Sequence, residues 1–250
     1  MKNICTYFVL FFTFITTCHA GVIIGGTRVI YNEGRKDASI DIENPDNIAY
    51  LIQSWIDDEN GKSQSIFSIT PPLFKLPKES TNTLRIFLTE DILPNNRESL
   101  FWLNIKNIPS VKFKENSLQI AFRTQMKLIY RPQILKDVDF NQEQNKLIWS
   151  KSSDKLTAKN PTPYYINFQR ITFNGKQLKN VSYVAPFSTI TFSVNDLIQH
   201  GVVKWELIND FGATTKASER KNINIYNEKS TNGMLFFSAV LFMQHDHFIC

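Results

Sequence analysis

Three positively charged side chains lie within or at the end of otherwise apolar runs of this sequence. Arg28 interrupts the run TRVIY, Lys127 interrupts the run MKLI, and Arg131 ends a run just before a proline. One interpretation is structural, with each side chain reaching solvent or pairing with a nearby carboxylate. The other is chemical, because two cations held in a cleft bind a carboxylate through charge-assisted hydrogen bonds that desolvation strengthens. The sequence therefore predicts either ordinary ion pairs or an anion-binding site.

The side chains that common catalytic reactions need do not form a set in this chain. His200 alone of the four histidines lies inside a predicted domain, and its place beside a glycine predicts a solvated ring. The run His245-Asp246-His247 is a weak metal motif without further ligands. No glycine-rich phosphate loop occurs, and Cys250 is the only cysteine after residue 20, so we expect no nucleotide site and no Cys–His nucleophile. We expect no enzyme, cofactor or metal, although the sequence alone leaves paired-carboxylate catalysis open.

Apolar alternation is clearest over residues 118–132 (LQIAFRTQMKLIYRP). Leu118, Ile120 and Phe122 share one face of an extended strand there, and polar residues share the other face. An Arg-Pro pair ends the segment, because proline cannot continue a ladder of backbone hydrogen bonds. The pattern predicts either a half-buried strand of a β-sandwich or an edge strand that pairs with a strand of another protein.

Short extended segments separated by turn residues predict an all-β fold of sandwich type. A polar stretch without periodicity predicts a hinge near Gln142, between two domains. We expect a first domain over 21–141, a second over 142–219, and an atypical tail over 220–250. The expected strands of the first domain are 22–31, 38–42, 49–56, 67–70, 83–88, 100–105 and the strand from Leu118; those of the second are 156–160, 164–173, 179–184, 188–194 and 203–208.

The first 20 residues have the pattern of a secretory signal. Lys2 precedes the apolar run 7–15, and small residues lead to a cleavage site predicted after Ala20. Lipidation of Cys18 is an alternative that the residues before it fit poorly. The remaining chain carries a net charge of only +4 with no long basic run, which excludes a dedicated nucleic-acid binder.

Several segments together, in their order and spacing, carry a resemblance to a known family. They are 26–31 (GTRVIY), 50–55 (YLIQSW), 70–74 (TPPLF), 97–104 (RESLFWLN), 108–109 (IP), 118–122 (LQIAF), 127–132 (KLIYRP), 160–165 (NPTPYY), 185–188 (APFS) and 208–213 (INDFGA). Over about residues 22–216 the chain resembles the periplasmic pilus-assembly chaperones of the bacterial chaperone–usher pathway. This resemblance implies a non-enzymatic, ATP-independent chaperone of the periplasm, with pilus subunits and an outer-membrane usher as partners.

The resemblance also implies a fold and a mode of binding. The fold would be two immunoglobulin-like β-sandwich domains arranged in an L. Arg28 and Lys127 would anchor the C-terminal carboxylate of a pilus subunit, and Leu118, Ile120 and Phe122 would lie on the strand that completes the subunit's own sandwich. Lys127 and Leu118 have opposite parity along a regular strand, so twist, a bulge or the path of the strand must reconcile the two roles.

Further implications concern the domain link and the subclass. Glu98, Arg131 and Asp210 match positions that form an ionic link between the two domains. The short connection from Ile108 to Leu118, with too few cysteines for a disulfide, resembles the short-loop subclass. The apolar run 234–243 (MLFFSAVLFM) departs from the family and has no functional interpretation.

Other functions are compatible with parts of the pattern. A secreted adhesin or structural β-sandwich protein would need neither paired cations nor an exposed apolar strand, and a secreted hydrolase lacks recognisable catalytic residues. The client subunit, the usher and the fibre are not specified by the sequence. Weak self-association of the free protein through an uncapped edge strand also stays open.

Overall fold

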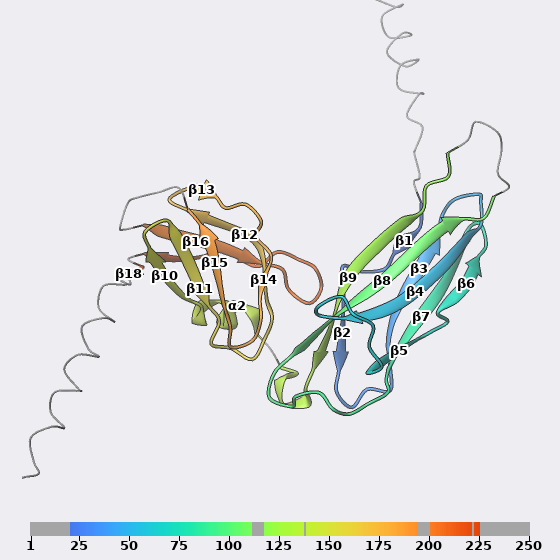
Figure 1. The fold of residues 1–250 in the computed structure, drawn as a ribbon, viewed down its shortest axis with the longest axis horizontal. Helices are drawn as coiled ribbons and strands as arrows, with labels where there is room; N and C mark the ends of the chain where they lie inside the picture. The colour runs from blue at the N-terminus through green and yellow to red at the C-terminus, as the bar shows by residue number, and fades with distance from the viewer. Residues whose placement is uncertain (1–20, 112–117, 138, 195–200, 222, 226–250) are drawn as a thin grey trace, which may run out of the picture. The chain divides into compact units, whose positions relative to one another are not determined.

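The structure is a computed structural model that describes residues 21–111, 118–137, 139–194, 201–221 and 223–225. Its described part is dominated by strands, and its contacts divide the chain into two compact units. Unit 1 contains the described residues up to Leu93 and those of Leu100–Ile129, and unit 2 contains Pro94–Ser99 and the described residues from Tyr130 onward. Figure 1 shows a β-sandwich of two sheets in each unit. The predicted all-β fold with two sandwiches is confirmed.

Several predictions concern residues outside the described part of the chain. These are the signal segment 1–20, all four histidines, all three cysteines and the apolar run 234–243. Within the described residues, no helix is long and apolar enough to cross a membrane.

Unit 1 consists of a four-stranded and a five-stranded sheet. The first has the order β1-β3-β7-β5 and the second the order β2-β9-β8-β4-β6. The strands of the first are β1 (Ile23–Ile24), β3 (Ala38–Asn44), β7 (Ser80–Leu88) and β5 (Phe67–Thr70). The strands of the second are β2 (Arg28–Asn32), β9 (Phe122–Arg131), β8 (Ser99–Pro109), β4 (Tyr50–Asp58) and β6 (Leu73–Leu76).

Alternating apolar residues on the facing sides of these sheets form the core of unit 1. Ile42 and Leu84 come from one sheet, and Ile52, Leu103 and Leu128 come from the other; each is 0% exposed. Successive side chains of a strand point to opposite faces, so every second residue lies on the same face. Burial of that face therefore fixes the strand register. The core therefore holds β9 in place through the half of the strand that contains Leu128.

The segment predicted as one strand over 22–31 is divided between the two sheets. Its first part, β1, pairs with β3, whereas its second part, β2, neighbours β9 in the opposite sheet. Gly25 and Gly26 lie between them, and a Cβ atom on Gly25 would approach the Asp41 carbonyl oxygen to 3.3 Å. The Gly25 amide donates to that same oxygen at 2.8 Å. A glycine at this point therefore lets the chain pass close to β3 as it changes sheet.

Unit 2 consists of a second pair of sheets. One has the order β15-β11-β10-β18, and the other has the order β13-β12-β16-β17 with β14 also paired to β12. The strands of the first are β15 (Thr189–Ser193), β11 (Lys155–Lys159), β10 (Ile148–Ser152) and β18 (Asn224–Ile225). The others are β13 (Lys176–Gln177), β12 (Ile166–Phe173), β16 (Val202–Leu207), β17 (Ser218–Lys221) and β14 (Tyr183–Val184).

The core of unit 2 is built around aromatic side chains. Trp149 and Trp205 are buried with ring centroids 5.2 Å apart, and Phe168 packs 6.0 Å from Trp149. The expected hinge near Gln142 contains a single helical turn, α2 (Phe140–Glu143), whose first turn is capped by the Asp139 side chain. Short 3-10 turns at Gln133–Leu135 and Gln144–Lys146 lie on either side of it.

The strands β6, β10, β13, β17 and β18 were not predicted, and β9 begins later than predicted, at Phe122. In β10, an inward position carries Lys151, whose ammonium donates to the Ser153 carbonyl at 2.6 Å and lies 5.8 Å from the Phe173 ring. A buried lysine removes the apolar alternation by which sequence analysis finds a strand. The strand β9 begins at Phe122, so residues 118–121 lie before it and are not part of a strand. In the expected tail, residues 220–221 end β17 and residues 224–225 form β18, so its first part belongs to unit 2.

Candidate functional site

Two cations lie on neighbouring strands of the five-stranded sheet in unit 1. Arg28 is the first residue of β2, and Lys127 is in the middle of β9, which is next to β2 in the sheet. Both residues are half-buried and alternate with buried apolar residues, since Val29 follows Arg28 and Met126 and Leu128 flank Lys127. The predicted pairing of Arg28 with Lys127 is therefore compatible with the geometry of the sheet.

The charges of this pair act on each other. Burial, and then the positive charge of Arg28, lower the pKa of Lys127 from 10.5 to about 8. An ammonium with a lowered pKa gains free energy when an anion approaches, because the anion favours its charged form. The pair can therefore bind a carboxylate by charge-assisted hydrogen bonds.

Three large apolar side chains are exposed just before and at the start of β9. Leu118 is 83% exposed, Ile120 is 51% exposed and Phe122 is 60% exposed. We call residues 118–122 the apolar segment. Exposed apolar residues in alternating positions are unusual in a monomer, because they favour association with another protein. The apolar segment therefore has the composition and exposure of a strand-binding surface.

Lys127 and the apolar side chains of the segment have opposite parity along the chain. Met126 and Leu128 have the parity of Phe122 and are buried in the core of unit 1, whereas Lys127 has the other parity and lies with Arg28. The face that leaves the core at Met126 thus continues as the exposed apolar face at Phe122. This arrangement keeps Lys127 and the exposed apolar side chains on a single continuous stretch of chain.

The third predicted group, Glu98, Arg131 and Asp210, forms a compact ion cluster in unit 2. The Arg131 guanidinium donates to Glu98 Oε1 at 2.7 Å, and it donates to both oxygens of Asp210 at 2.5 and 3.0 Å. Glu98 and Arg131 are 2% and 3% exposed, and the Tyr165 amide donates to the second oxygen of Glu98 at 2.7 Å. Arg131 therefore contacts both of the carboxylates with which the family resemblance groups it.

Burial and charge act in opposite directions within this cluster. Burial raises the pKa of Glu98 to about 7, against the opposing effects of Arg131 and the Tyr165 amide. Burial tends to lower the pKa of Arg131, but its hydrogen bonds and ion pairs with Asp210 and Glu98 outweigh this and raise the pKa. The guanidinium also lies 5.8 Å from the rings of Phe140 and Tyr164, so aromatic faces complete its surroundings. Arg131 is thus held charged by partners on several sides.

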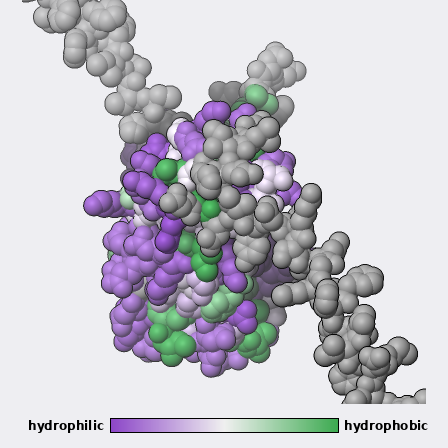
Figure 2. Space-filling view, turned by 90° about the vertical axis from the view of Figure 1, so that its left-hand side faces the viewer, coloured by the Kyte–Doolittle hydropathy of each residue, from purple (hydrophilic) through white to green (hydrophobic). Residues whose placement is uncertain are grey.

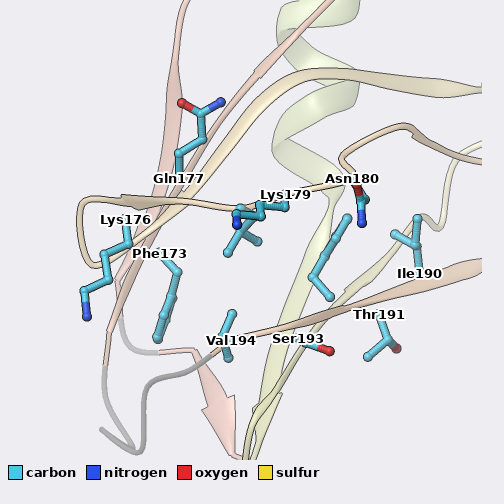
Figure 3. A pocket seen from close by; sticks show the side chains of 11 residues that line it. Phe173, Lys176, Gln177, Lys179, Asn180, Ile190, Thr191, Ser193 and Val194 are labelled. Carbon is cyan, nitrogen blue, oxygen red and sulfur yellow. The ribbon is translucent and has the colours of Figure 1, made fainter.

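Other features of the described residues do not add a second site of this kind. A cavity of about 670 Å³ lies in unit 2 between the ends of β12, β13 and β15; Figure 3 shows Lys176, Lys179 and Phe173 among the side chains around it. It contains none of the predicted site residues. In Figure 2 the visible face is mainly hydrophilic, with small separated hydrophobic groups. The described part of the chain contains no group of three or more metal-ligating side chains.

Sequence reasoning did not identify one buried polar residue beside the apolar segment. Asn104 is 0% exposed and accepts hydrogen bonds from Arg123 and Gln125 at the start of β9. Its place within the apolar run 100–105 (LFWLNI) was the available signal. A buried polar residue in such a run needs hydrogen-bond partners. The partners of Asn104 on β4 and β9 are distant in the sequence, so the spacing of residues does not reveal them.

Comparison with known proteins places this geometry in a family. The description "Pili and flagellar-assembly chaperone, PapD N-terminal domain" matches residues 21–136, and "Pili assembly chaperone PapD, C-terminal domain" matches residues 142–219. The chaperone protein FocC of Escherichia coli is 41% identical over 212 residues, which cover 83% of this chain and 92% of FocC. The chaperone protein HifB of Haemophilus influenzae is 37% identical over 226 residues, which cover 85% and 93%.

Solved structures agree with these matches. The Salmonella enterica SafB chaperone, solved in complex with the SafA pilin, matches with a TM-score of 0.75 and 32% identity, over 82% of this chain and 98% of that chain. The Escherichia coli chaperone DraB matches with a TM-score of 0.73 and 33% identity, over 80% and 96%. The chain therefore belongs to the family of PapD-like pili assembly chaperones.

Proposed function

We propose that this protein binds pilus subunits in the periplasm, supplies the strand that their sandwiches lack, and delivers them to an outer-membrane usher. The observation that carries the proposal is the exposed apolar segment, which leads directly into the strand that holds Lys127. Backbone hydrogen bonds of an added strand provide affinity, and alternate side chains fill pockets of the partner. Complete burial of Leu118, Ile120 and Phe122 would contribute about 5–9 kcal/mol before entropic costs.

Arg28 and Lys127 have the complementary role in this proposal. They bind the C-terminal carboxylate of the subunit and so fix where the subunit's last strand begins along β9. A charged anchor sets the register, whereas the apolar pockets alone would tolerate a slip of two residues. The lowered pKa of Lys127 supports this role, because a carboxylate would relieve the unfavourable surroundings of the ammonium.

The remaining assignments follow from family membership and from the ion cluster. Glu98 and Arg131 lie in the stretch that matches the N-terminal domain, and Asp210 lies in the stretch that matches the C-terminal domain. We infer that their cluster links the two domains. We also assign the chain to the short-loop subclass, from the short connection between Ile108 and Leu118, and place signal cleavage after Ala20.

The test is recovery of chaperone–subunit complexes from the periplasm after co-expression with a pilus subunit of the same gene cluster. Ile120→Asp should abolish recovery, because a carboxylate would have to enter an apolar pocket. Ile92→Asp is the matched control, since Ile92 is 67% exposed in unit 1 and lies outside the apolar segment. Arg28→Ala and Lys127→Ala should also abolish recovery while circular dichroism shows folded protein. Normal recovery with all three site variants would refute the proposal. Binding of glycans or host proteins, without any effect of deleting the protein on subunit stability, would favour the adhesin alternative.

A further inference from the structure

A hydrogen-bonded polar cluster lies on the outer face of the five-stranded sheet in unit 1. Asn104 on β8 is at its centre and is paired across the ladder with Trp55 on β4. Arg123 and Gln125 reach Asn104 from β9. Both lie on the face of β9 opposite Phe122, and they directly follow the apolar segment. The cluster therefore joins three adjacent strands at the point where the apolar segment enters the sheet.

Every hydrogen-bonding position of the Asn104 side chain is used. Its Nδ2 donates to Asp57 Oδ2 at 2.9 Å and to the Trp102 carbonyl at 3.1 Å. Its Oδ1 accepts from Arg123 Nε at 3.1 Å and from Gln125 Nε2 at 3.2 Å. An amide offers two donors and two acceptor lone pairs, so the side chain is saturated. The amide nitrogen faces a carboxylate and the amide oxygen faces a guanidinium, which is the orientation that both charges favour.

A second set of contacts supports the ends of this cluster. Trp55 Nε1 donates to the same Asp57 oxygen at 3.1 Å, and the Arg123 guanidinium lies 5.4 Å from the Trp55 ring centroid. Arg123 is thus held by a hydrogen bond from one side and a cation–π contact from another. An exposed arginine that kept its rotamer freedom would have neither contact. The start of β9 is therefore tied to β4 and β8 through side chains as well as through the ladder.

This constraint affects how a partner strand would be bound. The apolar segment has few contacts of its own, because its three large side chains face solvent. Its direction is set by the first residues that are held in the sheet, which are the residues around Arg123 and Gln125. Ordering these residues before a partner arrives lowers the entropic cost of binding.

We propose that Asn104 is a positioning residue that fixes the start of β9, so that the apolar segment is presented to a subunit in one direction and register. The inference rests on the proposed function and adds a residue that does not touch the subunit. Asn104 acts through its hydrogen bonds with Arg123 and Gln125. Replacing Asn104 should therefore have no further effect on binding once these two side chains have been replaced.

The test is a double-mutant cycle in the full-length mature protein. Asn104→Leu keeps the number and branching of the side-chain heavy atoms and removes the four hydrogen bonds, and Arg123→Met with Gln125→Met removes the two partners on β9. Each change alone should weaken subunit binding about tenfold, mainly through a slower association rate. The combination should weaken binding no further, because both changes remove the same constraint. Lys106→Met, two residues along the same face of β8, is the control and should leave binding unchanged.

Hydrogen exchange of the free protein provides a readout that needs no subunit. Asn104→Leu should accelerate exchange of residues 122–125 at least fivefold and leave the core amides of β3 and β7 unchanged. A merely structural role would instead lower protection throughout unit 1. If Asn104→Leu fails to fold, the β9 double variant alone decides, since Arg123 and Gln125 are exposed and their replacement should be tolerated.

Two outcomes separate this inference from the proposed function. If wild-type protein binds no pilus subunit, the proposed function fails, and the exchange experiment still decides whether Asn104 fixes the start of β9. If wild-type protein binds and the single variants bind equally well, or if their effects add fully, the positioning role of Asn104 is refuted and the proposed function stands.

Discussion

Raising the pH should weaken the binding of a subunit carboxylate through one side chain, Lys127. Burial of its ammonium, and then the neighbouring charge of Arg28, lower its pKa from 10.5 to about 8 in the unbound protein. An incoming carboxylate should move that pKa back upward, because it favours the charged form. Binding should therefore be independent of pH below about 7 and should weaken as the pH rises through 8.

The size of the effect follows from this pKa. The difference between 10.5 and about 8 corresponds to roughly 3 kcal/mol, and partial solvent exposure reduces it to the order of 2 kcal/mol. At pH 9 about one tenth of the unbound molecules keep the charge, so affinity should fall about tenfold between pH 7 and pH 9. Stability of the free protein should change in the opposite direction. The unfolded chain holds the proton up to 10.5, so the cost of the buried charge is present below 8 and is relieved between 8 and 10.5.

The assay is calorimetric titration with a synthetic peptide of the subunit's last strand, at pH 7, 8 and 9 and constant ionic strength. Wild-type protein should show the fall, whereas Lys127→Arg should bind independently of pH, since a guanidinium stays charged over this range. The same peptide with an amidated C-terminus controls for other titrating groups and should bind weakly at every pH. An equal fall for the acid and the amide, or for Lys127→Arg, would refute the reasoning.

Three further predictions concern stability, each measured by urea unfolding followed by fluorescence. Arg131→Met should destabilise unit 2 by about 3–5 kcal/mol, because it leaves two carboxylates near one another without their shared cation; a loss below about 1 kcal/mol would contradict this. Glu98→Gln should cost less than half as much, because burial raises the pKa of Glu98 from 4.5 to about 7 and its neutral form is accessible. With that pKa raised on folding, the contribution of Glu98 should decrease as the pH rises from 4.5 to 7, and the Gln variant should lack this slope. Gly25→Val should destabilise unit 1 by about 1–3 kcal/mol, because its Cβ would press on the Asp41 carbonyl oxygen. Gly34→Ala is the comparison, because its Cβ would meet no atom within 4 Å. It therefore measures only the cost of a side chain at positive φ.

The strands that sequence analysis identified contain no buried charged side chain at an inward position of the core. The run 49–56 contains Ile52 and Ile56 at inward positions, and β4 is found there. The strand β10 has the buried Lys151 at an inward position, and its burial depends on the Ser153 carbonyl and the Phe173 ring, which no local pattern specifies. Prediction of β10 thus failed because tertiary contacts satisfy a buried charge, whereas β13 and β17 are short strands with no buried residue to make a pattern.

The candidate site was predictable to the same degree. The spacing of Leu118, Ile120 and Phe122 predicts a shared face, and all three side chains are exposed, although β9 lies between β2 and β8 and is not an edge strand of the sheet. The roles of Arg28 and Lys127 came from a family resemblance, and the electrostatic coupling between them required the sheet order β2-β9. Asn104 was missed because its four partners come from three strands, at sequence distances that spacing does not connect.

The two ends of strand β9 differ in burial: Met126 and Leu128 are buried in the core, whereas Phe122 at the start is exposed. Its last half buries Met126 and Leu128 in the core and ends at the Arg131 ion cluster, so the strand is held without any contribution from the apolar segment. The exposed residues before it are then free of a stabilising role, and substitutions there should change binding far more than folding. A long exposed apolar strand favours aggregation, and charged residues on its other face limit that tendency. Arg123 and Lys127 supply those charges. Asn104 accepts a hydrogen bond from Arg123, and the charge of Arg28 lowers the pKa of Lys127. The polar face of β9 therefore orients the strand, while the apolar segment at its start stays exposed.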